Sequence, residues 1–260
     1  MLVMGILNVT PNSFSDGGKF ATSKTAITHG LQLLEDGADI IDIGGESTRP
    51  GAERVSLLEE QERVLPVIKE LSKQGVQVSI DTMNAETAAK AVHAGATIVN
   101  DVSGGLADEK MLHTVAALDV PYIAMHWRAH SKVMDNQNRY DDVAKDVVKE
   151  LSSRIKAALR AGIKQEYLYL DPGIGFAKNA EQNWELLQNF EVIKNLHFPL
   201  LLGASRKRFL SEFGGDEAKD RDAATLALTL WAAEHDLWAV RVHEVKNTVQ
   251  ALHAWEKLHR

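Results

Sequence analysis

One short pattern recurs along the sequence and restricts the folds that the chain can adopt. A helix-like segment ends in Gly and a short run rich in β-branched residues follows, at residues 35–42, 73–81 and 93–100 and more loosely at 160–171. Glycine just past a helix readily takes the left-handed conformation that ends it. Short apolar runs of this kind are typical of strands buried on both faces of a parallel sheet. The pattern therefore predicts repeated helix–strand units.

About eight such strands can be placed in the 260 residues. The predicted strands cover residues 3–9, 39–43, 76–81, 97–101, 122–125, 167–171, 199–203 and 239–242. Helices are predicted between them, among others at residues 23–36, 57–74, 142–161, 180–195, 222–235 and 245–258.

Strict alternation of strands and helices implies right-handed βαβ units, and about eight units in a chain of this length imply a closed barrel. We therefore predict the α/β class and a single-domain (β/α)₈ TIM barrel over residues 1–260. The alternative is an open, doubly wound sheet. Against it, no G-x-G-x-x-G motif follows the first predicted strand.

Composition excludes several kinds of chemistry. The chain has no cysteine, which rules out disulfides, thiolate catalysis, zinc–thiolate sites and iron–sulfur clusters. Its net charge of -7 argues against nucleic-acid and anionic-membrane partners but permits a local basic pocket. No run approaches the roughly 20 apolar residues of a membrane span. Residues 1–9 are apolar but lack the basic flank of a signal peptide, so we expect a cytoplasmic protein.

Polar residues end nearly every predicted strand, where a barrel places its active site. Any one of them is more typical of a helix cap or a turn. Together, around one rim, they predict a binding site for a polar ligand. The residues are Asn8, Asp42, Asp81, Asn100, His126, Asp171, Ser205, Arg206, Lys207, Arg241 and His243.

Two long motifs resemble the signatures of the dihydropteroate synthase family. They are MGILNVTPNSFSDGG at residues 4–18 and DIGGESTRPGA at residues 42–52. Shorter motifs follow in family order, so the resemblance covers nearly the whole chain. These are SIDT at 79–82, VND at 99–101, DPGIGF at 171–176, GASRK at 203–207 and RVH at 241–243.

The resemblance implies a (β/α)₈ barrel and one reaction. The family condenses (7,8-dihydropterin-6-yl)methyl diphosphate with 4-aminobenzoate, giving 7,8-dihydropteroate and diphosphate in folate biosynthesis with Mg²⁺. The two substrates are thus the expected small-molecule partners. The family is usually dimeric, so a homodimer is expected.

The resemblance also implies which side chains hold the pterin. A carboxylate can accept two donors side by side, as the amine and ring N–H of a pterin edge require. Asp171 is the expected partner of that edge, although Asp-Pro-Gly is also a common turn signal. The other expected pterin contacts are Asp81, Asn100, Met125 and Lys207.

The diphosphate is expected to lie against Arg241 and His243, which point to one side of an extended strand end. The alternative is a surface arginine and a capping histidine. Asn8 is the expected Mg²⁺ contact, since Mg²⁺ prefers oxygen ligands and keeps several waters. An aromatic amine needs no strong base, so an SN1-like loss of diphosphate is expected. The residues expected to be catalytic are Asp81, Lys207, Arg241 and His243.

Two loops, residues 10–18 and 44–51, are rich in Gly, Ser, Thr and Asn and are expected to close the site. In the family such loops order around diphosphate and aminobenzoate. Thr48, Arg49 and Pro50 match family contacts there, and Phe14 matches a family aromatic. Phe176 would form an apolar wall for the benzoate ring or would simply belong to the core.

The chain departs from many family members at two positions. Asn12 replaces an aspartate, which weakens any role for a charge there. Arg208 replaces a serine that helps to hold the benzoate carboxylate in those members. Arg208 would pair with that carboxylate or would point to solvent.

Two other functions differ from the synthase in the sequence motifs that they require. A methyltetrahydrofolate:corrinoid methyltransferase would need neither the Arg-Val-His motif nor the Thr-Arg-Pro loop. A catalytically silent pterin-binding paralogue would show degraded motifs, of which Asn12 is the single instance. A dimer face would draw on Trp231, Trp238, Trp255 and Leu252, although these suit helix–barrel packing better.

Overall fold

The computed structural model describes residues 1–10, 18–47 and 51–259, and it contains one sheet of eight parallel strands. The strand order is β6-β5-β4-β3-β2-β1-β8-β7. A bridge between Leu170 and Leu200 brings the two edges together, so the sheet nearly closes into a barrel. The strands are β1 Leu2–Asn8, β2 Ile40–Gly44, β3 Gln77–Asp81, β4 Ile98–Asp101, β5 Tyr122–Met125, β6 Leu168–Asp171, β7 Leu201–Leu202 and β8 Ala239–Val242.

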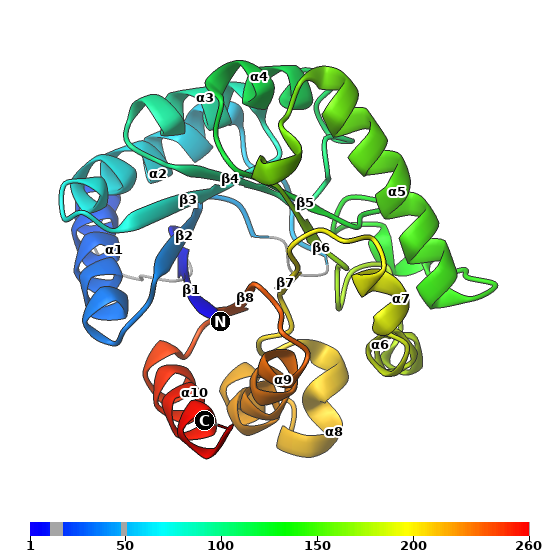
Figure 1. Ribbon diagram of the computed structural model, residues 1–260. Helices are drawn as coiled ribbons and strands as arrows, with labels where there is room; N and C mark the ends of the chain where they lie inside the picture. Colours follow the sequence, from blue (N-terminus) through cyan, green and yellow to red (C-terminus); the bar gives the residue numbers. More distant parts are fainter. Residues whose placement is uncertain (11–17, 48–50, 260) are drawn as a thin grey trace.

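Helices alternate with the strands and surround them (Figure 1). They are α1 Gly18–Glu35, α2 Leu57–Ser72, α3 Ala85–His93, α4 Met111–Leu118, α5 Val143–Ala161, α6 Ala180–Gln188, α7 Glu191–Lys194, α8 Ser211–Gly214, α9 Asp222–Glu234 and α10 Val245–His259. Among the described residues, none of these helices combines the length and hydrophobicity that a membrane crossing requires. The predicted (β/α)₈ barrel is confirmed.

The glycine pattern from the sequence marks helix ends as expected. Gly162 follows α5 with φ 102°, and its N–H bonds to the carbonyls of Ala158 and Leu159. Gly95 follows α3 with φ 118°. Both conformations are strained for residues with a side chain, which explains the recurrence of glycine before a strand.

The single helix predicted over residues 180–195 is wrong, because the chain forms α6 and α7 there. The Asn189 side chain bonds to the carbonyl of Glu185 at 2.8 Å and ends the first helix. Phe190 then turns into the core, where it is 1% exposed and meets the Trp231 ring edge-on at 5.0 Å. Burial of this ring outweighs one more turn of regular helix.

Two apolar layers and one polar layer follow from the strand register. A large cluster lies between the strands and the helices. A smaller one, with Met4, Ile40 and Ile98, fills the barrel near the start of the strands. Near the strand ends, Asn8 is level with Gly44, Gly44 with Asp81 and Asp81 with Asn100. The polar strand ends therefore share one level above an apolar plug.

A buried carboxylate ties α2 to the segment after β3. Glu60 is 1% exposed and accepts hydrogen bonds from Thr82 Oγ1 at 2.6 Å, Asn84 Nδ2 at 2.7 Å and Thr87 Oγ1 at 2.6 Å. Three donors on one carboxylate fully satisfy a charge that would otherwise be costly to bury.

Replacing Glu60 should therefore destabilise the barrel. In Glu60→Gln, the amide NH₂ faces at least one of the three donors and cannot accept its hydrogen bond. The remaining bonds are no longer charge-assisted. We expect the free energy of unfolding to fall by about 2 kcal/mol in urea denaturation. The matched control is Glu70→Gln on the same helix, where a solvent-exposed pair with Lys73 is lost and a change below about 0.5 kcal/mol is expected. Equal stability of the two variants would contradict this role.

Candidate active site

Arg241 lies between two carboxylates at the barrel mouth. Its Nε donates to Asp42 Oδ2 at 2.6 Å, and its Nη2 donates to Asp81 Oδ2 at 2.7 Å. Asn100 Nδ2 also donates to Asp42 Oδ2, at 3.0 Å. Asp42 is fully buried. These bonds join the ends of β2, β3, β4 and β8 into one network.

The network holds more negative than positive charge in a confined space. Burial raises the pKa of Asp81 to about 7. The charge of Asp42 also raises this pKa, whereas the Arg241 guanidinium lowers it. Because such a carboxyl changes its protonation near neutrality, it is well suited to facing a charge that appears during a reaction.

A second acid–cation pair lies across the mouth. The N–H of Gly173 donates to Asp171 Oδ1 at 2.7 Å. A β-carbon at Gly203 would lie 3.1 Å from Asp171 Oδ2, so only glycine leaves that oxygen open. Burial raises the pKa of Asp171, and the charges of Lys207 and Arg241 lower it.

Lys207 shares this pocket with Asp171. Burial lowers the pKa of Lys207 to about 8, and the Arg241 charge acts in the same direction while Asp171 and Asp81 oppose it. Its Nζ lies 4.1 Å from the centroid of the Phe176 ring. The predicted residues Asp81, Asn100, Asp171, Lys207 and Arg241 are thus brought within electrostatic reach of one another.

An apolar wall borders these charges. Met125 is 3% exposed and Phe176 is 6% exposed, and both belong to one buried cluster with Val102 and Met134. An apolar surface beside a row of polar groups is the lining that a flat heterocycle needs, because its faces are apolar and its edge carries donors and acceptors. Phe176 is therefore a core residue whose ring also contacts Lys207. Its role as a wall for the benzoate ring stays a prediction.

His243 and Lys207 are positioned by neighbouring side chains. Ser205 and Arg206 belong to the predicted polar rim, whereas no sequence motif pointed to Asp222. Ser205 Oγ lies 3.0 Å from His243 Nδ1 and accepts the backbone N–H of His243 at 3.2 Å. Arg206 is left-handed with φ 58° and pairs through Nε and Nη2 with Asp222, at 2.6 and 2.8 Å. A strained residue held by an ion pair sets the direction of the lysine that follows it.

No motif in the sequence predicts a left-handed conformation for Arg206, because residues with a positive φ are usually glycine. Asp42 is a different case. No role was predicted for it beyond its place among the polar strand ends, yet it lies at the centre of the charge network.

Asn8 Oδ1 borders an open space at the barrel mouth. A β-carbon at Gly44 would lie 3.8 Å from Asn8 Oδ1 and 3.6 Å from Asp81 Oδ2, so both oxygens border the space that this glycine leaves open. Oxygen donors of this kind fit Mg²⁺. In the described part of the chain, no group of three or more His, Cys, Asp or Glu is placed to hold a metal. A single protein contact is the arrangement that the residues fit.

Arg208 points outward in this structure. Its side chain is 70% exposed and its Nη2 lies 3.2 Å from Asp135 Oδ2, across the mouth on the segment after β5. Of the two sequence interpretations, the solvent-facing one describes Arg208 in this structure. Thr48, Arg49 and Pro50 lie outside the described residues, as do Asn12 and Phe14.

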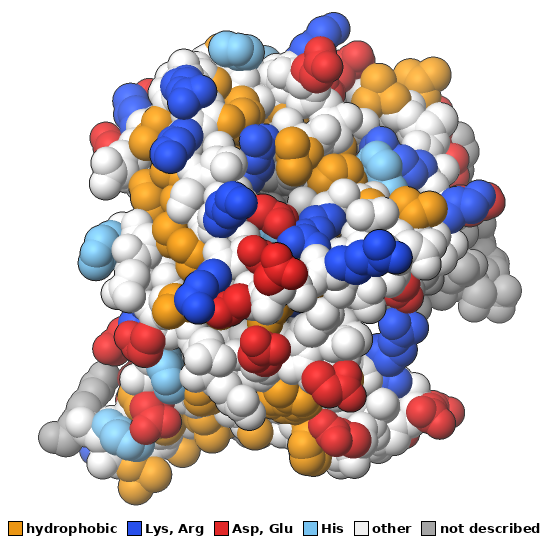
Figure 2. Space-filling view, turned by 90° about the vertical axis from the view of Figure 1, so that its right-hand side faces the viewer, with side chains coloured by type: hydrophobic (Ala, Val, Ile, Leu, Met, Phe, Trp, Pro, Cys, Tyr) orange, Lys and Arg blue, Asp and Glu red, His pale blue; other side chains and the backbone are white. Residues whose placement is uncertain are grey.

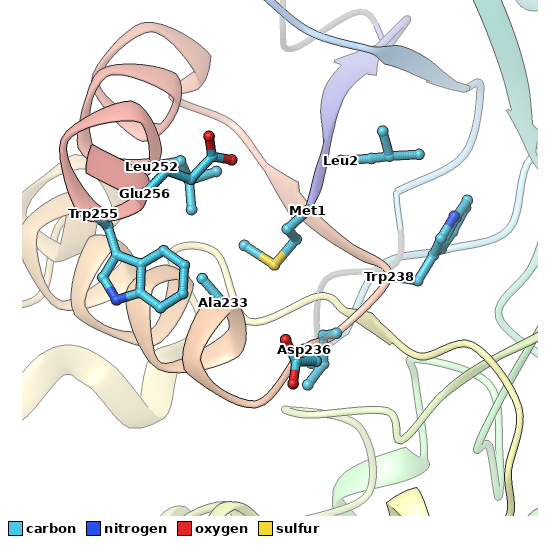
Figure 3. Close-up of a pocket in the computed structure, with 9 residues that line it drawn as sticks. Met1, Leu2, Ala233, Asp236, Trp238, Leu252, Trp255 and Glu256 are labelled. Carbon is cyan, nitrogen blue, oxygen red and sulfur yellow. The ribbon is translucent and has the colours of Figure 1, made fainter. Parts of the chain in front are cut away.

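A cavity of about 380 Å³ lies at the opposite end of the barrel. Met1, Leu2 and Trp238 line it, together with Trp255 of α10 (Figure 3). Trp255 and Trp231 pack against the main core, and the Trp238 ring lies 4.2 Å from that of Tyr169. Trp231 and Trp255 thus pack, partly buried, against the helix–barrel core, whereas Trp238 packs against the cluster inside the barrel. A dimer face built on these residues stays a prediction.

The charges on the outer surface are mixed in sign. On the face shown in Figure 2, lysine and arginine side chains alternate with aspartate and glutamate. Exposed ion pairs occur on the surface of the described chain, such as Lys145 with Asp142 at 2.7 Å. Interspersed charges of this kind favour solubility more than the binding of a polyanion.

Comparison with known proteins gives one consistent result. The family model described as "Pterin binding enzyme" matches residues 4–243. The chain is 46% identical over 257 residues to dihydropteroate synthase of Mycobacterium leprae, covering 96% of this chain and 90% of the relative.

Solved structures agree with the sequence relatives. A Xanthomonas albilineans dihydropteroate synthase with 4-aminobenzoic acid superposes with a TM-score of 0.93 at 44% identity, over 99% of this chain and 93% of that one. The same enzyme in complex with 7,8-dihydropteroate gives 0.89 at 42% identity, with the same two coverages.

The Arg241 network generates a prediction about stability. Asp42→Asn keeps the side-chain shape but removes one of the two charges that hold the buried guanidinium. The free energy of unfolding should fall by about 3 kcal/mol, measured by urea denaturation. Asp135→Asn, which breaks the exposed pair with Arg208, is the control and should cost less than about 1 kcal/mol. The account fails if Asp42→Asn is as stable as the control.

Proposed function

Because the chain belongs to the pterin binding enzymes, and within them to the dihydropteroate synthases, we propose that the barrel mouth is where this family's reaction takes place. The enzyme is a transferase of folate biosynthesis. It joins (7,8-dihydropterin-6-yl)methyl diphosphate to 4-aminobenzoate and releases diphosphate. The observation that carries the proposal is the convergence of Asp171, Lys207 and Arg241 with Asp81 and Asn100 at one mouth.

The pterin ring lies with its donor edge on Asp171. The two oxygens of this carboxylate accept from the exocyclic amine and the ring N–H, Oδ1 in addition to the N–H of Gly173, with Asn100 and Asp81 as further in-plane partners. Lys207 donates to the carbonyl side of the ring. Met125 and the Phe176 ring give the apolar faces a dry surface, which strengthens each polar contact.

The diphosphate lies nearer the entrance, against Arg241 and His243. A guanidinium carries five N–H donors, so its bonds to Asp42 and Asp81 leave donors for phosphate oxygens. Ser205 fixes the His243 ring for the same purpose. Asn8 Oδ1 is the protein contact for Mg²⁺, which when bound supplies positive charge to the departing diphosphate.

The reaction breaks the bond between the pterin methylene carbon and the diphosphate oxygen. The electron-rich dihydropterin spreads the positive charge that appears on the methylene, and Asp81 faces that charge as a carboxylate. The neutral amine of 4-aminobenzoate then forms the new C–N bond and loses a proton to water. Arg241 and His243 stabilise the charge on the leaving group, which is the main catalytic effect of the site.

The 4-aminobenzoate ring packs on Phe176. Arg208 binds its carboxylate by leaving Asp135, since an exposed surface pair is held by about 1 kcal/mol or less. Thr48, Arg49 and Pro50 belong to the loop that the resemblance places over this substrate.

A cytoplasmic homodimer stays a prediction from the sequence. The relatives favour neither the silent paralogue nor the corrinoid methyltransferase.

The direct test of the proposal is release of diphosphate that depends on 4-aminobenzoate. Wild-type protein with Mg²⁺ and the pterin diphosphate should release diphosphate when the amine is added and little without it. Asp171→Asn should weaken binding of 6-hydroxymethylpterin about 10- to 100-fold by calorimetry, because charge-assisted bonds to the pterin edge are lost. Release without the amine, or an unchanged pterin affinity in Asp171→Asn, would contradict the proposal.

The pKa of Lys207 gives a pH dependence. Because the pKa is lowered to about 8, the ammonium is present below that pH and is lost as the pH rises through it. The affinity for 6-hydroxymethylpterin, measured without Mg²⁺, should therefore fall by up to about tenfold between pH 7 and 9. In Lys207→Arg the charge persists, so its affinity should fall less over this range. Titration of the ligand itself is common to both proteins. Parallel pH profiles would show that Lys207 does not bind the pterin as a cation.

A further inference from the structure

A buried lysine that the mechanism does not use lies behind the pterin site. Lys178 is 6% exposed, and its Nζ donates to the carbonyls of Pro172 at 3.2 Å, Gly173 at 3.0 Å and Phe176 at 3.1 Å. The loop between β6 and α6 therefore wraps its carbonyl oxygens around one ammonium. Burial lowers the pKa of Lys178 to about 7, and the charge of Asp171 opposes this shift. The carbonyl cage favours the protonated form, because facing carbonyl dipoles repel one another less when a positive charge lies between them. The three N–H groups of that ammonium are shared among the three carbonyls and His126 Nδ1.

The loop conformation depends on this convergence. Gly173, Gly175 and Ala177 are all left-handed, with φ 68°, 77° and 48°. At Ala177 that conformation is strained. Strain of this kind persists only where the surroundings impose it. Two side chains hold this loop: Lys178 Nζ donates to the Phe176 carbonyl at 3.1 Å, and Asn183 Oδ1 accepts the N–H of Gly175 at 2.7 Å.

A second set of groups anchors the ammonium from behind. Lys178 Nζ lies 3.0 Å from His126 Nδ1, and His126 Nε2 lies 2.8 Å from Glu150 Oε2. Burial lowers the pKa of His126 to about 4, and the Lys178 charge acts in the same direction. The imidazole is therefore neutral at pH 7. Its Nε2–H donates to Glu150 and its Nδ1 accepts from Lys178.

The cage connects directly to the groups that face the pterin. Gly173 donates its N–H to Asp171 Oδ1 at 2.7 Å and offers its carbonyl to Lys178. Phe176 offers its carbonyl to the same ammonium, while its ring lies under Lys207 Nζ. Gly173 thus links Lys178 to the Asp171 carboxylate, and the Phe176 backbone links Lys178 to the Phe176 ring. The Lys178 charge also lowers the pKa of Asp171, next to the larger effects of burial and the nearer charges.

We propose that Lys178 is a positioning residue for the pterin subsite. Its ammonium, anchored by His126, is the cation around which the β6–α6 loop folds, and it fixes the Asp171 carboxylate through Gly173 and the Phe176 ring through that residue's carbonyl. This role rests on the proposed function for the identity of the ligand. It assigns Lys178 no contact with substrate.

The test separates the pterin subsite from the rest of the mouth. Lys178→Met keeps the length of the side chain and removes the charge. Its affinity for 6-hydroxymethylpterin should fall at least about tenfold by calorimetry, while its affinity for inorganic diphosphate with Mg²⁺, bound by Arg241 and His243, should change less than about twofold. Lys156→Met, on the exposed side of α5, is the matched control and should change neither.

A second variant asks whether the charge or the hydrocarbon stem is responsible. Lys178→Ala leaves the carbonyl cage empty, and n-butylammonium should restore pterin affinity where n-butanol does not. His126→Leu removes the rear anchor and should weaken pterin binding by a smaller factor than Lys178→Met.

The outcomes are distinguishable. Wild-type protein that fails to bind 6-hydroxymethylpterin would overturn the proposed function itself. Wild-type binding with unchanged affinity in Lys178→Met would overturn the role of Lys178 alone. Variants that do not fold, or that lose pterin and diphosphate binding together, would show that Lys178 stabilises the whole fold and would overturn the proposal as well. Equal rescue by butanol would do the same.

Discussion

The bridge from Arg241 to Asp42 and Asp81 is the interaction on which the mouth of the barrel depends. It ties the last strand to the second and third, and Asn100 extends it to the fourth. The attraction between the guanidinium and the two carboxylates offsets the cost of removing all three charges from water. Under the proposed function the leaving diphosphate binds this same guanidinium, so one set of bonds would serve both stability and charge stabilisation.

The layered interior explains why this network can exist. Apolar side chains such as Met4 and Ile98 fill the lower barrel, and the polar strand ends sit above them at one level of the register. Parallel strands present their ends at the same rim, so residues far apart in the sequence meet there without long loops. Gly44 and Gly203 leave space beside Asp81 and Asp171, which keeps these oxygens open to a ligand.

The sequence predicted what depends on periodicity and on strand ends. All eight strands are where the apolar runs placed them, and Asp81, Asn100, Asp171, Lys207 and Arg241 converge as expected. It did not predict what depends on loop conformation. The left-handed Arg206 and the cage around Lys178 arise from contacts between distant segments, and the break between α6 and α7 arises from burial of Phe190. No local pattern encodes these contacts.

The central claim is that the barrel mouth binds the pterin at its base and the diphosphate near its entrance. A crystal structure with Mg²⁺ and an unreactive analogue of the pterin diphosphate tests it most directly. The account predicts the amino-pyrimidine edge on Asp171, the ring beside Lys207 and Met125, and phosphate oxygens on Arg241 and His243. An analogue seated elsewhere, or one with its phosphates at Lys207 and its ring at Arg241, would contradict it.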